Sequence, residues 1–155
     1  MTGEERALAA VARSRIAYDI VRHGPVRSLE EAAAVRGMAP RQLLKTLVVR
    51  RAEDDYLFVL VPGDREISWP KLRAHLGVNR ISMPDAGTAR EVTGYERGTI
   101  TPFGSVRALP VVADATVTRS TVSIGAGGHG VAVVVGADAL VVALDAEVAD
   151  VTDPA

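Results

Sequence analysis

The chain has 155 residues, of which 48% are hydrophobic and 24% are charged, and its formal net charge is −1. This length and composition predict one globular domain over residues 1–155 with a sizeable core. The small net charge argues against tight, autonomous binding of nucleic acid, and the absence of cysteine excludes disulfides, thiolate metal sites and a cysteine nucleophile. The charged, helix-like start and the lack of a long apolar run predict a protein without signal peptide or membrane span, for which the cytoplasm is the expected location.

The first half of the chain is predicted to alternate helices and strands. Thr2 or Gly3 is expected to cap the first helix, and Ser28 and Glu31 have the spacing of a capping box at the start of the second. Two β-rich runs on either side of Asp54 are typical of a hairpin. The expected elements are, in order, a helix over 2–14, a strand over 16–21, a helix over 28–37, a helical turn over 40–42, paired strands over 43–51 and 56–61, and a helix over 68–76.

The second half is predicted to be richer in strands, with the apolar run 131–135 as a central strand and the residues after 152 frayed. The expected elements are a short strand over 80–83, a helix over 84–92, strands over 109–113 and 117–124, a glycine-rich turn over 125–130, a strand over 131–135, a helix over 136–144 and a strand over 148–151. Hairpins among alternating helices and strands indicate an α+β fold, with a mixed, partly barrel-like sheet core flanked by helices.

Lys45 lies within the apolar segment LLKTLVV, and it is one of only two lysines among 18 basic residues. One interpretation is an edge-strand lysine whose stem packs while its ammonium reaches water. The other is an ammonium on a cleft wall, which would hold a carbonyl, a phosphate or a developing oxyanion.

Two glycine-rich segments are further candidates for a site. The first, GYERGTITPFG, runs from Gly94 to Gly104 and has a G-x-x-x-P pattern between Gly98 and Pro102. Such a loop can present backbone N–H and C=O groups to a ligand, although it can equally be a structural connection. The second, GAGGHG, is either a hairpin turn or an anion-binding nest, but it is neither a P-loop nor a dinucleotide-binding fingerprint.

The three histidines are far apart in the sequence, and their spacing supports no metal site. His23 ends a strand and His129 lies in the glycine-rich turn, so either is a candidate to line a cleft, whereas His75 is expected on a helix surface. No G-x-S-x-G elbow marks a nucleophilic serine.

Taken in order, HGPVRSLEEAAAVRGMAPRQLLKTLVVR, GVNRISMPD, GYERGTITPFG and GAGGHG with ADALVVAL resemble the YbaK/ProX-type aminoacyl-tRNA deacylases, the free-standing relatives of the editing domain of bacterial prolyl-tRNA synthetases. The resemblance covers nearly the whole chain. It implies hydrolysis of the ester that links a wrong amino acid to the end of a tRNA, typically tRNA-Pro carrying alanine, cysteine or another small residue. It implies neither a metal nor another cofactor.

The resemblance also implies a set of site residues. The key lysine of its KTL segment falls on Lys45, and the glycine of its loop, whose backbone holds the scissile carbonyl or the water, falls on Gly98. The substrate-binding positions that it implies are His23, Thr46, Pro102, Phe103, Gly104, Gly125, Gly127 and His129. The expected partner is the acceptor end of an aminoacyl-tRNA, with a synthetase or an elongation factor supplying further affinity. The apolar wall of the pocket is expected to include Ile20, Leu47 and Ile100, and its size to exclude larger aminoacyl groups.

Two departures from the family pattern concern the pocket. Gly125 stands where some members have serine, and Val21 and Arg22 stand where some have tyrosine. Two alternatives therefore stay open beside the deacylase: a catalytically weak module that binds a synthetase or tRNA, and a small-molecule or nucleotide binder that uses GAGGHG as an anion nest.

Overall fold

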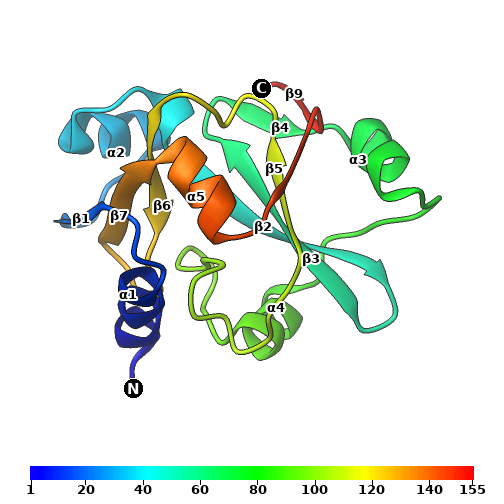
Figure 1. Cartoon of the computed structure of the whole chain (residues 1–155), viewed down its shortest axis with the longest axis horizontal. Coiled ribbons are helices and arrows are strands. Elements are labelled where there is room, and N and C mark those ends of the chain that lie inside the picture. The colour runs from blue at the N-terminus through cyan, green and yellow to red at the C-terminus, as the bar shows by residue number, and fades with distance from the viewer.

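A computed structural model describes residues 1–155 as five α-helices, one 3₁₀ turn and nine strands (Figure 1). The helices are α1 (Gly3–Arg13), α2 (Leu29–Arg36), η1 (Pro40–Gln42), α3 (Trp69–Leu76), α4 (Ala86–Thr93) and α5 (Ala137–Ala143). The strands are β1 (Tyr18–Arg22), β2 (Leu44–Ala52), β3 (Asp55–Pro62), β4 (Arg65–Ile67), β5 (Val111–Asp114), β6 (Thr121–Gly125), β7 (Val131–Gly136), β8 (Glu147–Ala149) and β9 (Thr152–Pro154).

The strands form three open sheets in the orders β1-β7-β6, β2-β3-β5-β8 and β4-β9. The four-stranded sheet is mixed, because β2 pairs with β3 antiparallel whereas β5 pairs with β3 and β8 parallel. A parallel bridge between Leu43 and Ser123 joins the two larger sheets at one corner, but none of the sheets closes on itself. The predicted α+β class with a mixed sheet is confirmed.

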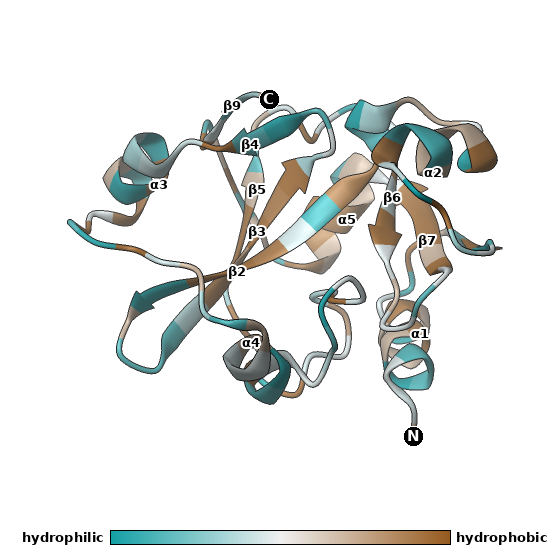
Figure 2. Cartoon of the chain, turned by 180° about the vertical axis from the view of Figure 1, so that it is seen from behind, coloured by the Kyte–Doolittle hydropathy of each residue, from teal (hydrophilic) through white to brown (hydrophobic).

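The core lies on both faces of β3, which is hydrophobic along most of its length (Figure 2). Phe58 and Leu60 belong to the larger cluster of buried side chains, which also includes Ile124, Val133 and Leu140 from the other sheet and α5. The alternate residues of β3 belong to a second cluster together with Leu72 of α3. Because successive strand residues point to opposite faces, a strand buried on both faces has a continuous apolar sequence.

The predicted helix ends are confirmed by their capping contacts. Thr2 accepts a hydrogen bond from the backbone N–H of Glu5, whose carboxylate accepts one from the N–H of Thr2. The Ser28 hydroxyl accepts a hydrogen bond from the N–H of Glu31, whose carboxylate accepts from the N–H of Arg27, and Gly37 ends α2 in the left-handed conformation that glycine adopts without strain. The central position of β7 is confirmed as well.

Two predictions from the sequence are wrong. Residues 80–83 form no strand, since Ser82 makes only an isolated bridge with Arg50. Residues 153–155 do not fray: β9 pairs with β4, and the N–H of Ala155 donates to the carbonyl of Asp64. The buried carboxylate of Asp114 accepts a hydrogen bond from the N–H of Val151, directly before β9, and so ties the end of the chain to the core.

Candidate active site

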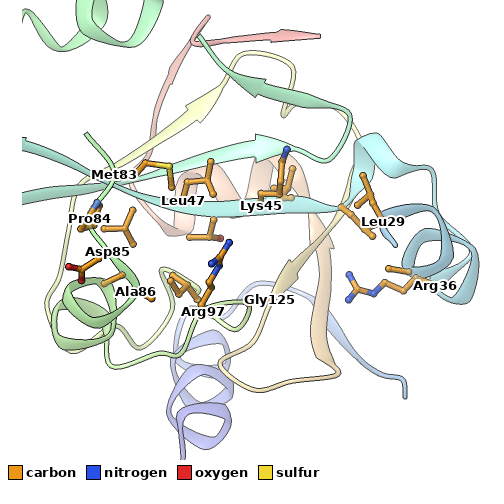
Figure 3. Close-up of a pocket in the computed structure, with 18 residues that line it drawn as sticks. Leu29, Arg36, Lys45, Leu47, Met83, Pro84, Asp85, Ala86, Arg97 and Gly125 are labelled. Carbon is orange, nitrogen blue, oxygen red and sulfur yellow. The ribbon is translucent and has the colours of Figure 1, made fainter. Parts of the chain in front are cut away.

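A cavity of about 700 Å³ runs along one side of β2, between α2 and α4 (Figure 3). The loop that contains Gly98 and the end of β6 complete its wall. Eighteen residues line it: Leu29, Ala32, Arg36, Leu43, Leu44, Lys45, Thr46, Leu47, Val48, Met83, Pro84, Asp85, Ala86, Ala89, Arg97, Gly98, Ile100 and Gly125. Segments from five separate parts of the chain therefore meet at this cavity.

The cavity lies where the edge of β2 is open. This strand is at the end of its sheet, and on its outer side it is bridged only at Leu43, to Ser123, and at Arg50, to Ser82. Arg50 exchanges both of its backbone hydrogen bonds with Ser82. Because alternate residues of an antiparallel strand direct their N–H and C=O groups to the same side, the backbone groups of Val48 and Thr46 face the open edge.

Thr46 adds an unpartnered hydroxyl to this edge. Its Oγ1 is buried but has no hydrogen-bond partner in the protein. Buried polar groups without partners are rare, because each has lost its hydrogen bonds to water. Thr46 itself lines the cavity, so a turn of its side chain would bring this hydroxyl to a polar atom of a ligand.

Lys45 lines the cavity, but its ammonium lies on the β4 side of β2 (Figure 3). Its Nζ donates to the carbonyl oxygen of Arg65, 2.6 Å away. Burial lowers the pKa of Lys45, and the nearby carboxylates of Glu66 and Asp64 oppose this effect. The ammonium is thus partly desolvated and bound to a neutral backbone group rather than to a carboxylate.

Arg36, at the end of α2, lines the opposite part of the cavity (Figure 3). Its terminal nitrogens bond the Ser123 hydroxyl at 2.8 Å and Nε2 of His23 at 2.9 Å, while its buried Nε has no partner. Burial lowers the pKa of this guanidinium. Since arginine only donates, Nε2 of His23 accepts, and the ring proton lies on Nδ1, which donates to the carbonyl of Gly24.

The loop that contains Gly98 is fixed by contacts beneath it. The hydroxyl of Tyr95 donates to the carbonyl of Phe103 at 2.6 Å, and Arg6 of α1 donates to the carbonyls of Gly104 and Gly94. Gly98 has a φ of +86°, and a Cβ built there would lie 3.9 Å from its nearest neighbour, a ring carbon of His129. Glycine is therefore required at this position by the backbone conformation and not by crowding.

The GAGGHG segment is the turn of the β6–β7 hairpin, one of the two alternatives that its sequence indicates. It packs against the Gly98 loop, because the N–H of Gly127 donates to the carbonyl of Thr99 at 3.0 Å. A Cβ on Gly125 would lie 3.2 Å from the carbonyl oxygen of Ile100. The two glycine-rich segments are thus brought together, and they meet at the cavity wall through Gly98 and Gly125.

The predicted site residues fall into two groups. Lys45, Thr46, Gly98 and Gly125 line the cavity, and His23 lies directly behind it through its contact with Arg36. The others lie outside the lining. Phe103 is buried in the core, and Pro102 and Gly104 are its neighbours in the sequence. Gly127 packs against Gly3, and His129 is exposed, with its Nε2 3.3 Å from Oε2 of Glu96.

The expected apolar wall is correct for Leu47 and Ile100, which line the cavity. It is wrong for Ile20, which lies on the edge strand β1 and is 46% exposed. Sequence reasoning also missed Arg36, Arg97 and Asp85 as cavity residues. No group of three possible metal ligands gathers anywhere in the chain, and no helix has the length and apolarity to cross a membrane.

Comparison with known proteins identifies the family of this chain. The family model described as the aminoacyl-tRNA editing domain matches residues 23–143. The chain therefore belongs to the aminoacyl-tRNA editing domain family.

The relatives found by sequence and by structure are consistent with this family. The chain is 35% identical over 121 residues to the proline–tRNA ligase of Heliobacterium modesticaldum, a match that covers 76% of this chain and 21% of that protein. It is 35% identical over 89 residues to the proline–tRNA ligase of Thermosipho africanus, a match that covers 57% of this chain and 16% of that protein. A crystal structure described as a candidate trans-editing enzyme for prolyl-tRNA synthetase superposes with a TM-score of 0.89 at 22% identity, over 99% of this chain and 98% of that one. The chain thus spans about a fifth or less of the length of these curated ligases.

Proposed function

We propose that the protein is a trans-editing deacylase that hydrolyses the ester between a wrong amino acid and the 3′ end of a tRNA. The expected substrate is tRNA-Pro carrying alanine, cysteine or another small amino acid. The observation that carries the proposal is the cavity at the open edge of β2, which unpaired backbone groups, Thr46 with its buried, unpartnered hydroxyl and the Gly98 loop line together. The family and its ligase relatives support the choice of substrate class.

The chemistry that we propose uses position more than acid–base catalysis. An aminoacyl ester is already reactive, so holding its carbonyl beside a water supplies much of the required acceleration. The backbone of the Gly98 loop orients the water, and the open edge of β2 aligns the ester. Lys45, whose ammonium is bound only to a carbonyl oxygen, exchanges that contact for the ribose or phosphate of the terminal adenosine.

Selectivity for a small side chain has a physical basis in the walls of the cavity. Leu47, Ala89 and Ile100 are among the apolar residues that line it. An apolar wall rejects a larger group by steric overlap, whereas it discriminates against a smaller group by only about 1 to 3 kcal/mol per methylene. Exclusion by size is thus the effective way for such a cavity to spare a correctly charged tRNA.

A second hollow, of about 440 Å³, supports binding of the tRNA backbone. Four arginines line it, and three of them, Arg50, Arg73 and Arg80, form no ion pair within the protein. It adjoins the first cavity along the chain, since Ser82 lines one and Met83 the other. A local basic surface is compatible with the net charge of −1, because net charge does not describe distribution.

The test is deacylation of tRNA-Pro charged with alanine, cysteine, serine or proline, by the wild type and by Lys45→Ala. Lys71→Ala is the matched control, since Lys71 is the other lysine of the chain and pairs with Asp150 and Asp153 away from the cavity. Hydrolysis of one mischarged species, lost in Lys45→Ala and kept in Lys71→Ala, is the expected result. Absence of hydrolysis on every species, with tRNA or a synthetase still bound, would replace the deacylase by the docking-module alternative.

A further inference from the structure

Three basic side chains line the cavity, and their hydrogen bonds distinguish them. The ammonium of Lys45 is bound to the carbonyl of Arg65, and the guanidinium of Arg36 is bound to Ser123 and His23. The side chain of Arg97, an exposed residue, makes no hydrogen bond and no ion pair with the rest of the protein, although it lines the same cavity. It is therefore the cavity cation with all of its donors available to a ligand.

The direction of the Arg97 side chain is equally specific. It rises from the loop towards β2, whereas the side chain of Lys45 extends from the other side of that strand (Figure 3). Thr46 and Val48, whose backbone groups face the open edge of β2, line the same cavity as Arg97. Arg97 directly precedes Gly98, so both residues reach the cavity from the same loop.

No acidic side chain of the cavity neutralises Arg97. Asp85, the acidic residue of the lining, accepts a hydrogen bond from the N–H of Thr88 at 2.7 Å as the cap of α4. Glu96, its neighbour in sequence, lies against His129 instead. Arg97 is exposed, so water screens its charge in the free protein, and its attraction for a negative charge increases when a bound substrate displaces that water.

We propose that Arg97 is a catalytic residue, which holds the carbonyl oxygen of the aminoacyl ester and stabilises the oxyanion that forms on it. This inference rests on the proposed deacylase function. The water oxygen forms a bond to the carbonyl carbon, and the electron pair of the C=O double bond moves to the oxygen that Arg97 holds. When that pair returns, the bond to the ribose oxygen breaks. The ribose oxygen takes up the proton that the water gives up, which leaves a free amino acid and a terminal hydroxyl.

The experiment compares Arg97→Gln and Arg97→Lys with the wild type in single-turnover deacylation of the mischarged tRNA that the wild type hydrolyses best. Arg90→Gln is the matched control, because Arg90 is an exposed arginine of the adjacent helix α4 outside the cavity lining. We expect Arg97→Gln to lower the maximal rate constant about 100-fold, which is typical for loss of one oxyanion donor. Arg97→Lys restores part of that loss, and Arg90→Gln leaves the rate unchanged.

A second measurement separates catalysis from binding. A tRNA that carries the amino acid through a non-hydrolysable amide is titrated against each variant, and we expect its affinity for Arg97→Gln to stay within about threefold of the wild type. A rate constant for Arg97→Gln equal to that of the wild type would overturn the inference and leave the deacylase intact. Loss of affinity with an unchanged maximal rate would overturn it too, since Arg97 would then bind the tRNA outside the reacting bond. A wild type inactive on every charged tRNA would remove the proposed function and the role of Arg97 together.

Discussion

Gly98→Ala tests whether the site depends on the backbone conformation of the loop, because the substitution strains that conformation without a steric clash. The added methyl group has room, since the nearest atom is 3.9 Å from the Cβ position. The cost of the substitution therefore comes from the φ of +86°, which an alanine adopts only with strain. That strain is about 1 to 2 kcal/mol for a left-handed residue, and relaxation of the loop to avoid it would move the backbone groups that line the cavity.

Gly77→Ala is the control for this prediction. Gly77 ends α3 with a φ of +68°, no atom lies within 4 Å of a Cβ built there, and it lies outside the cavity lining. We expect both variants to lose about 1 to 2 kcal/mol in urea unfolding, which for a chain of this size lowers the Tm by about 2 to 8 °C. Deacylation is expected to fall about 10- to 100-fold in Gly98→Ala alone. Equal activity in the two variants, whether retained or lost, would refute a specific role for the conformation of Gly98.

Two other substitutions test polar groups with opposite surroundings. Thr46→Val removes the buried hydroxyl that has no partner, so we expect unfolding in urea to show a gain of about 1 kcal/mol, together with slower deacylation if the hydroxyl binds substrate. Asp114→Asn should lower the free energy of unfolding by about 2 to 3 kcal/mol. One carboxylate oxygen accepts from the N–H of Val151 and the other from the N–H of Thr116, and an amide nitrogen would face one of these donors. Burial acts to raise the pKa of Asp114, but the hydrogen bonds from Thr116 and Val151 outweigh it and lower the pKa. The carboxylate therefore stabilises the fold above about pH 4, and this contribution is lost as the pH falls through the lowered pKa. Urea unfolding between about pH 7 and pH 3 should therefore show the difference between wild type and Asp114→Asn shrinking at the acid end, and a constant difference would refute this account.

The parts of the fold that the sequence predicts are those determined locally. Ser28 and Gly37 bound α2 through contacts within a few residues, and the hairpin around Asp54 forms between neighbouring strands. The end of the chain escaped prediction because its partners are distant: β9 pairs with β4, and the residue before it bonds to Asp114. A short polar strand has no periodic pattern, so its pairing is set by tertiary contacts.

In the candidate site, too, the sequence predicts the residues with a distinctive local pattern and misses those that depend on distant contacts. Lys45 is conspicuous as a lysine in an apolar run, and Gly98 lies in a segment whose glycines and proline mark a defined path, so the amino-acid pattern is sufficient to indicate both. Arg36 is, by its local pattern, a basic residue in the last turn of a helix, where such residues are common. Its role at the cavity depends on Ser123, which is 87 positions away in sequence, and nothing in the local pattern indicates that contact.

The open edge of β2 links the fold to the proposed function. An unpaired edge strand exposes backbone donors and acceptors that invite pairing with another chain, and proteins usually cover or interrupt such edges. Here the bridges to Ser123 and Ser82 cover the two ends of the edge, and the cavity walls contributed by α2, α4 and the Gly98 loop enclose what is left. The stretch that stays unpaired is the one that carries Thr46, which lines the same cavity as Arg97. Because the fold shields this edge from other strands without satisfying its hydrogen bonds, the remaining partners for those bonds are water and any ligand small enough to displace that water from the cavity.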